Sequence, residues 1–398
     1  MTPTRTGRKL LSWASQIEGG TLAQACETAS MSFVYPHVAL MPDAHLGKGA
    51  AVGTVIPTRG AVIPAAVGVD IGCGMIAART QFDVGDVERV RSGGRALHAL
   101  RTTIEASIPL SPGNYNLATS LGKWFAEKKI AELEERAEKD GVDLSHSPRW
   151  RQQLGSLGGG NHFIELCLDE QDRVWLFLHS GSRGVGNKIA QKHIKIAQDR
   201  CRRWHIELPN RDLAYLAEDT PEFGDYIREL RWAQRFAYLN RAEMMDRFAA
   251  VFGEWIGDPV RETERINCHH NYTEQEEHYG ETVWLTRKGA VDAHEGVAAV
   301  IPGSMGTRSY VVVGKGSKSG LCSAPHGAGR RFSRTEARRR FTVADLAQRM
   351  RGIEYRHGAE WVDEIPDAYK DIDVVMDDAR DLVEVRHELR QILNVKGT

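Results

Sequence analysis

The sequence has almost no excess of either charge, because 52 Lys and Arg stand against 53 Asp and Glu in 398 residues. A chain with so little net charge has no global positive field that steers polyanions, so any nucleic-acid surface must be a local patch. Long apolar runs are also missing: Gly, Pro, Thr and Arg break the most apolar tract, residues 50–69, and the basic N-terminus lacks the apolar core of a secretory signal. We therefore expect a cytoplasmic protein that binds no membrane.

Cysteine pairs are absent as well. The six cysteines are scattered without a CxxC motif, which fits neither a zinc ribbon nor a disulfide framework. Most of them are expected to be ordinary buried thiols. Cys73 is different, because it lies in a Gly-rich turn three residues after Asp70, in VGVDIGCGM, and this placement suits a metal ligand.

No repeat, low-complexity stretch or Pro/Ser-rich linker divides the chain, so we expect one domain over residues 1–398. Gly-rich turns alternate with β-like runs at 174–179, 282–286 and 309–314, and helical patterns occupy 116–140, 187–204 and 221–254. The first helix has a strongly charged face, which makes 114–150 a candidate helical insertion at the surface. The predicted fold class is α+β, a single mixed domain whose Gly-rich turns at strand ends form a central cleft.

Five short segments place side chains that bind metals in Gly-rich or turn contexts. One histidine beside glycines is more often structural, but the recurrence of carboxylate, thiolate and imidazole favours a divalent first-row metal, and a thiolate can bridge two ions. HExxH is missing, which excludes a helix-borne zinc protease site. The segments contain Asp43 and His45 (PDAHLGKG), Asp70 and Cys73 (VDIGCG), Asn161 and His162 (GGGNHFIE), His179 (LHSGSRG), and His269, His270 and Asn271 (CHHNY).

The usual signatures of nucleotide transfer are missing. A covalent lysyl nucleotide requires KxDG, but EKDG at 138–141 has Glu138 in place of the lysine, and GKGS at 314–317 lacks the upstream glycine of a P-loop. His326 in APHGAGR is a better nucleophile, because a tight Gly-Ala-Gly turn admits a phosphate to free backbone N–H groups. HGA recurs at 357–359, and the string alone favours a structural turn over a nucleophile. The Gly- and Ser-rich segment 302–320 upstream favours the nucleotide interpretation.

Eight ordered motifs resemble those of the RtcB family of RNA-splicing ligases. They are PDAHLGKGAAVGTVIP, VGVDIGCGM, LGSLGGGNHFIEL, LHSGSRGVGN, INCHHNY, IPGSMGTRSYVVVG, HGAGR and the near-terminal VKG. The resemblance covers nearly the whole chain, from about residue 35 onward. It implies an α+β domain of that family's type around a cleft for metal and nucleotide.

The resemblance also implies two manganese ions and GTP. It assigns the ions to Asp70, Cys73, His162, His179 and His270, with Cys73 bridging both, and it makes His326 the guanylylated nucleophile. Manganese comes from the family alone, since zinc or cobalt would bind such ligands more tightly. The residues implied for the nucleotide are Asn161, His162, Phe163, Ile164, Glu165, His270, Asn271, Pro302, Gly303, Ser304, Met305, Ser309, His326, Gly327, Ala328, Gly329 and Lys396.

The implied reaction joins RNA 2′,3′-cyclic phosphate or 3′-phosphate ends to 5′-hydroxyl ends, in tRNA splicing or RNA repair. It proceeds through His–GMP and then a GMP-capped RNA end, and a small activating protein, archease, is a candidate partner. Arg183, beside His179, is expected to bind the terminal RNA phosphate, while Arg330, Arg331 and Arg334 are expected to bind the RNA backbone. The arginines at 338–340 fit a solvated helix face equally well.

Two other classes of protein compete with the ligase. A binuclear metal phosphoesterase acting on RNA ends would use the same ligands but needs neither a nucleophilic histidine nor a guanine pocket. A non-catalytic RNA-binding protein would need stacking platforms and a wide basic field. With 8% aromatic residues and a net charge of −1, the sequence disfavours this second alternative.

Overall fold

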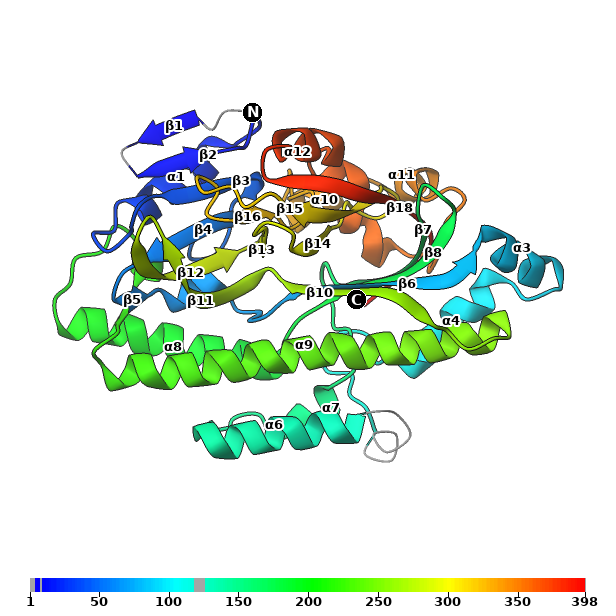
Figure 1. The fold of residues 1–398 in the computed structure, drawn as a ribbon, viewed down its shortest axis with the longest axis horizontal. Coiled ribbons are helices and arrows are strands. Elements are labelled where there is room, and N and C mark those ends of the chain that lie inside the picture. Colours follow the sequence, from blue (N-terminus) through cyan, green and yellow to red (C-terminus); the bar gives the residue numbers. More distant parts are fainter. Residues whose placement is uncertain (1–3, 8, 118–125, 398) are drawn as a thin grey trace.

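The computed structural model describes residues 4–7, 9–117 and 126–397, and two sheets form its centre (Figure 1). The six-stranded sheet has the order β1 (Thr4–Gly7), β2 (Leu10–Ser12), β3 (Val38–His45), β4 (Val52–Thr58), β12 (Glu281–Lys288) and β11 (Asn271–His278). The larger sheet has the order β10 (Glu262–His269), β6 (Gly74–Asp83), β8 (Arg173–Ser180), β7 (Phe163–Leu168), β18 (Val383–Lys396), β15 (Ser309–Gly314) and β14 (Ala298–Ile301), with β17 (Glu354–Tyr355) beside β18. Neighbouring strands are antiparallel except in the pairs β2–β3 and β17–β18. Two short ladders, β5 (Ala61–Val62) with β9 (Leu216–Ala217) and β13 (Ala290–Asp292) with β16 (Ser323–Pro325), complete the described strands.

The larger sheet is covered on both faces, as its alternating side chains require. On one face Met75 and Phe177 belong to a buried cluster with Leu285 of the smaller sheet. On the other face Ile76 packs in a cluster with Phe248 of α9 (Pro221–Ile256). The hydrophobic core therefore lies partly between the two sheets and partly between the larger sheet and α9.

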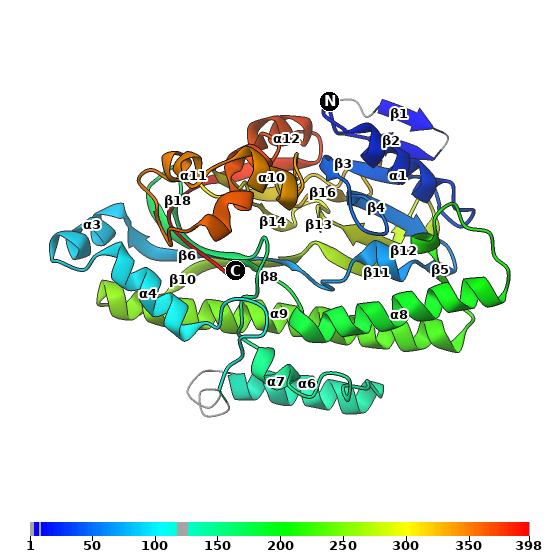
Figure 2. The same cartoon turned by 180° about the vertical axis from the view of Figure 1, so that it is seen from behind.

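Two long helices run side by side below the sheets, α9 and α8 (Arg183–Arg203) (Figures 1 and 2). α9 begins where Thr220 caps the backbone N–H of Phe223 and Pro221 occupies the first turn, and it ends at Gly257, whose φ of 91° is left-handed. The remaining α-helices are α1 (Gly19–Ala29), α2 (Pro64–Val67), α3 (Val84–Ser92), α4 (Leu97–Ser107), α6 (Ala126–Asp140), α7 (Trp150–Gln153), α10 (Arg334–Arg340), α11 (Val343–Arg349) and α12 (Ile372–Asp378). The 3-10 turns are η1 (Arg211–Leu213), η2 (Ala359–Glu364) and η3 (Pro366–Ala368).

The predicted α+β class is confirmed, and so are the elements predicted within the described residues. β8, β12 and β15 contain the three predicted strands, and α8 and α9 contain most of the two long helices. Of the helix predicted over 116–140, residues 118–125 lie outside the described part, and α6 occupies 126–140. α6 is a surface helix that buries only Ala126 and Leu133, as its charged pattern predicted. Among the described residues, no helix is both long and apolar enough to cross a bilayer.

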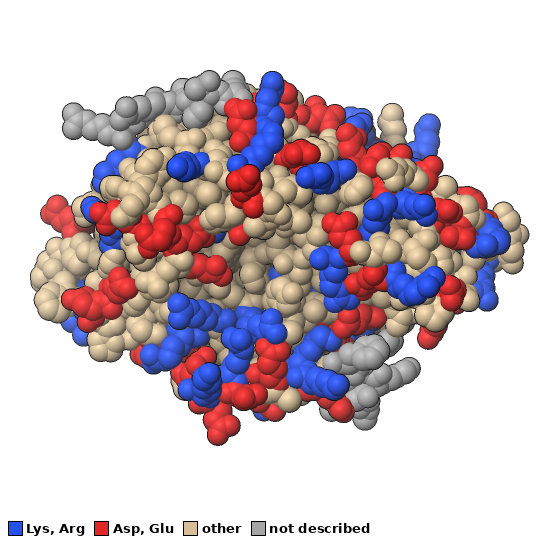
Figure 3. Space-filling view, viewed as in Figure 1, with Lys and Arg blue, Asp and Glu red and all other residues tan. Residues whose placement is uncertain are grey.

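Charged side chains of both signs alternate over the face shown in Figure 3. Where α6 meets α9, the basic residues are paired with acids: Arg235 Nε lies 2.5 Å from Glu132 Oε1, and Lys129 Nζ lies 2.9 Å from Glu243 Oε2. This face is therefore not a continuous basic field, which agrees with the net charge of −1.

Candidate metal and nucleotide site

Five potential ligand side chains meet where the two sheets join. Cys73 directly precedes β6, His179 lies in β8 and His162 directly precedes β7, so three neighbouring strands of the larger sheet bring them together. Asp70 lies in the turn that leads to β6. His270 is the single residue between β10 and β11, where the chain passes from the larger sheet to the smaller one.

The ligand atoms converge within hydrogen-bond distance of one another. Cys73 Sγ lies 3.3 Å from His162 Nε2 and 3.2 Å from His179 Nε2. His162 Nε2 lies 3.1 Å from Asp70 Oδ2, and His179 Nε2 lies 2.9 Å from His270 Nε2. The structure thus brings together all five residues to which the family resemblance assigns the metal.

His162 contacts polar groups through both ring nitrogens: its Nδ1 lies 2.9 Å from Leu157 O and 3.1 Å from Arg183 Nη1, and its Nε2 faces Asp70 Oδ2. The tautomers of His179 and His270 follow from Nδ1, which lies 3.2 Å from Asn161 O in His179 and 3.2 Å from Asn271 Oδ1 in His270. An oxygen acceptor at Nδ1 places the proton there, so the Nε2 atoms of these two rings present lone pairs to each other. Lone pairs that face each other repel, and a cation between them removes this repulsion. The donor set therefore fits a metal.

Burial sets the protonation states in the same direction. It lowers the pKa of His179 and of His270 well below the usual value, and nearby histidines lower both further, so both rings are neutral. Burial alone would raise the pKa of Asp70, but the hydrogen bond and charge of His162, together with Arg183, hold it below the usual range. Burial and the Asp70 charge raise the pKa of the Cys73 thiol. A cation among the ligands favours the Cys73 thiolate instead.

Two buried residues of α9 fix the loops that carry these ligands, and the sequence analysis did not identify them. Asn240 accepts the Gly155 N–H at 2.7 Å and donates to Gly181 O at 3.1 Å. Arg241 donates to Gly72 O at 2.7 Å and to Ser180 O at 3.1 Å. In the sequence, Asn240 and Arg241 stand out as two adjacent polar residues in a largely apolar stretch of α9. Which loops they contact can be seen only in the fold.

His326 lies beside the metal ligands, with its ring centroid 4.7 Å from that of His270. Its Nδ1 lies 2.6 Å from Asp43 Oδ2, which also accepts its backbone N–H at 3.1 Å. Asp43 is fully buried. The sequence suggested Asp43 as one of several potential ligands, but in the structure its carboxylate orients His326 and leaves Nε2 free.

The turn after His326 requires glycine at its end. Gly329 has a φ of 72°, and a side chain there would collide with the backbone carbonyl of Asp43. This close approach packs the HGAG turn against β3, the strand that holds Asp43. The turn therefore fixes both partners of the His326–Asp43 pair.

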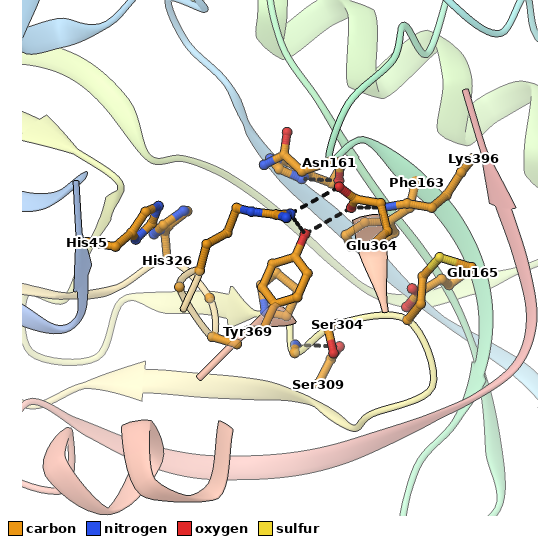
Figure 4. A pocket seen from close by; sticks show the side chains of 18 of the residues that line it. His45, Asn161, Phe163, Glu165, Ser304, Ser309, His326, Glu364, Tyr369 and Lys396 are labelled. Atoms are coloured by element: carbon orange, nitrogen blue, oxygen red, sulfur yellow. Dashed lines mark hydrogen bonds and ion pairs between the residues drawn. The ribbon is translucent and has the colours of Figure 1, made fainter. Parts of the chain in front are cut away.

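A cavity of about 260 Å³ opens next to His326 (Figure 4). Most of the residues expected to bind the nucleotide line it, but His162, Ile164, His270 and Asn271 do not. Ile164 packs on the opposite face of β7, Asn271 bonds to His270, and His162 and His270 lie among the potential metal ligands. Six further residues that were not expected to bind the nucleotide line the cavity: His45, His179, Arg330, Arg334, Glu364 and Tyr369. The expected residues in its wall are Asn161, Phe163, Glu165, Pro302, Gly303, Ser304, Met305, Ser309, His326, Gly327, Ala328, Gly329 and Lys396.

Glu364 is the electrostatic centre of the cavity wall. Its carboxylate lies 2.5 Å from Lys396 Nζ, 3.2 Å from Arg330 Nη1 and 2.5 Å from Arg334 Nη1. Burial alone would raise its pKa, but Lys396 and Arg334 lower it to about 2. Three positively charged side chains thus surround one carboxylate, and His326 lies in the opposite wall of the cavity.

The four arginines expected to bind RNA occupy different environments. Arg330 also donates to Asp363 O at 2.8 Å, so its guanidinium belongs to the cavity wall, as does that of Arg334. Arg331 is exposed. Arg183 lies next to the metal ligands, with its Nη1 3.1 Å from His162 Nδ1. Arg183 is therefore a candidate for phosphate binding beside the potential metal ligands, whereas Arg330 and Arg334 belong to the wall of the cavity.

Comparisons with known proteins agree with the eight motifs. The family model described as tRNA-splicing ligase RtcB matches residues 24–397. The chain is 46% identical to the RNA-splicing ligase RtcB of Escherichia coli strain K12, over 96% of this chain and 95% of the relative. It is also 30% identical to the tRNA-splicing ligase RtcB of Pyrobaculum aerophilum, over 93% of this chain and 89% of that protein.

Proposed function

This chain belongs to the RtcB family of tRNA-splicing ligases, and from that membership we propose that it seals RNA 3′-phosphate or 2′,3′-cyclic phosphate ends to 5′-hydroxyl ends with GTP. The observation that carries the proposal is the orientation of His326. Its Nδ1 is hydrogen-bonded to Asp43 Oδ2. Its ring faces His270 of the candidate metal site and lies beside the cavity of about 260 Å³. A metal phosphoesterase, in contrast, does not require a nucleophilic histidine beside a nucleotide cavity.

In the proposed first step, Nε2 of His326 attacks the α-phosphorus of GTP and the bond to pyrophosphate breaks. Asp43 keeps the Nδ1 proton in place and stabilises the positive charge that develops on the ring. The cations Lys396, Arg330 and Arg334 balance phosphate charge, and Glu165 at the far end is positioned for polar contact with the base. The product is a phosphoramidate between His326 and GMP.

In the later steps, the RNA receives and then releases the same GMP. Water opens a cyclic phosphate to a 3′-phosphate, whose oxygen displaces His326 from the GMP phosphorus. The 5′-hydroxyl of the second RNA then attacks the 3′-phosphorus, GMP leaves, and a phosphodiester is formed. Arg183 is placed to hold the terminal phosphate next to the metal ligands.

Manganese ions held by Asp70, Cys73, His162, His179 and His270 would supply Lewis acidity to the phosphoryl oxygens. The chain's own contribution is to keep the imidazoles of His179 and His270 neutral by burial, which lowers the pKa of both, and to exclude water. Cys73, at 3% exposure, lies centrally among these ligands. Cys73 would bind a metal ion as the thiolate.

The test is incubation of the protein with α-labelled GTP and Mn²⁺, followed by denaturing electrophoresis. We expect acid-labile label on the wild-type chain and none on His326→Ala, which should still bind Mn²⁺. Cys73→Ala should lose both label and metal binding, because it removes the ligand between His162 and His179. Label that persists on His326→Ala would assign the nucleophile to another residue.

An unlabelled wild-type protein that still hydrolyses RNA 3′-phosphate ends would support the phosphoesterase instead. The end chemistry has its own control. Efficient joining of a 5′-phosphate RNA, in place of the 5′-hydroxyl RNA, would contradict the proposed final step.

A further inference from the structure

The outer face of α8 carries a concentration of positive charge that the proposed reaction does not use. The helix contains seven Lys or Arg and one acid, in a chain whose net charge is −1. Lys188, Lys192 and Lys195 share one face at helical spacing and are exposed. Arg203, at the C-terminal end, continues the same face.

The helix that carries this basic face begins next to the candidate metal ligands. The first residue of α8 is Arg183, whose guanidinium lies 3.1 Å from His162 Nδ1. From there the 21-residue helix extends for about 30 Å. In Figure 2 it lies across the side of the molecule on which α10, from the cavity wall, is also seen. An RNA strand held at the candidate metal site therefore reaches the far end of the helix only if it is long enough to span this distance.

The far end of the helix presents an exposed aromatic ring. The Trp204 side chain is 65% exposed, although tryptophan usually buries most of its surface. The Arg200 guanidinium lies 5.9 Å from its ring centroid, and Arg203 precedes it directly. An indole flanked by guanidinium groups is a stacking platform for an unpaired base.

The ordinary roles of such residues explain only part of this surface. Basic residues in a last turn favour the helix dipole, and Arg200 and Arg202 also pair with Glu222 and Asp199. Lys192 lies 2.6 Å from Glu229. For Lys195 and Arg203, no carboxylate among the described residues lies within ion-pair distance, and the dipole does not account for Lys195 or for the exposed indole.

We propose that Lys188, Lys192, Lys195, Arg203 and Trp204 form a track for single-stranded RNA. In this α8 track, the lysines contact phosphates of a strand that leaves the metal centre beside Arg183, and Trp204 stacks on a base at the far end. This proposal rests on the proposed ligase function, because the track begins at the site of that reaction. It extends that function by predicting a preference for long unpaired ends, because short ends do not reach Trp204.

The test compares RNA oligonucleotides of about 5 and about 20 nucleotides with a 3′-phosphate, by fluorescence anisotropy of the full-length protein. Trp204→Ala is expected to weaken binding of the long RNA about tenfold and to leave the short RNA unchanged, whereas Trp204→Phe keeps a ring and should restore most of the affinity. Lys195→Glu combined with Arg203→Glu should lower the slope of log K against log salt by about 2, again with the long RNA only.

Arg386→Glu is the matched control, because Arg386 is an exposed arginine on β18, a strand of the larger sheet that lies away from α8 (Figure 1). All variants should keep wild-type labelling by α-labelled GTP, which shows that they fold. Equal loss for both RNA lengths, or no loss with Trp204→Ala, would overturn the track; in the latter case the exposed indole serves a protein partner. Failure of the wild type to label would refute the ligase proposal, while the length dependence of binding remains measurable.

Discussion

At His326, the contact with Asp43 decides what the ring can do. A histidine on a Gly-rich turn is ambiguous in the sequence, because the same HGA string recurs at 357–359. The fully buried carboxylate 2.6 Å from Nδ1 distinguishes His326, since it fixes the tautomer and leaves Nε2 as the free nitrogen.

We predict that Asp43→Asn slows guanylylation of His326 about hundredfold, because an amide orients the ring without stabilising its developing charge. Single-turnover labelling with α-labelled GTP measures this rate. Affinity for Mn²⁺, measured by calorimetry, should stay unchanged, since Asp43 contacts none of the five ligands. A normal labelling rate in Asp43→Asn would mean that the pair is only structural.

Glu165 gives the cavity a pH dependence. Burial raises the pKa of this carboxyl from 4.5 to about 8, although Lys396 and Asn394 oppose the change. Between pH 4.5 and about pH 8 the folded protein therefore binds one more proton at Glu165 than the unfolded chain does. The free energy of unfolding consequently falls as the pH rises through this range. Glu165→Gln removes the effect, and its Tm should exceed that of the wild type by about 5 °C once the pH passes 8.

Thermal melts of the nucleotide-free protein across this pH range test the prediction. Glu384→Gln, at an exposed position of β18, is the control and should follow the wild type at every pH. A constant difference between Glu165→Gln and the wild type would show that the side chain titrates normally in the folded state.

At the scale of elements, α9 connects folding with the candidate metal site. Its buried Asn240 bonds to the loops at Gly155 and Gly181, one of which leads to His162 while the other follows His179. We predict that Asn240→Ala lowers the free energy of unfolding by about 3 kcal/mol, because it leaves several buried backbone groups without a partner. Affinity for Mn²⁺ should fall about 10- to 100-fold.

Thr220→Ala is the matched control in the same helix. It removes the N-cap contact to Phe223 and should cost about 1 kcal/mol without changing metal affinity. Chemical denaturation and metal titration separate the two variants. Equal metal affinity in Asn240→Ala and the wild type would show that the loops keep their positions without this residue.

The strands and long helices were predictable because they depend on local pattern. VWLFLH and SYVVVG are short runs of aromatic, β-branched and other apolar residues that end at turns, and the α9 segment has a cap, a proline at its start and a terminal glycine. The junction at His270 was not predictable as a passage between two sheets. Strand order depends on contacts between segments far apart in the chain, which local periodicity does not encode.

At the scale of the whole molecule, the candidate metal site joins the two sheets. Three ligands come from neighbouring strands of the larger sheet, and His270 stands at the crossing to the smaller one. A cation that binds only the folded state stabilises it, so Mn²⁺ at about a hundred times its Kd should raise the Tm by about 5 °C.

Differential scanning calorimetry with Mn²⁺ and then with excess chelator measures this shift. Cys73→Ala should show no shift, because Sγ is within 3.3 Å of both His162 Nε2 and His179 Nε2. An equal rise in Cys73→Ala would locate the stabilising ion elsewhere.

By itself, the sequence determined the kinds of chemical groups and their local setting. The thiol of Cys73, the imidazoles and the glycines that admit a phosphate can be read from it, because residue type and turn propensity are local properties. Only the tertiary structure decided the partners: Asp43 with His326, Glu364 with Lys396, and Asn240 with the ligand loops. These contacts join residues far apart in the chain, and packing of the two sheets and α9 is what brings them within bonding distance.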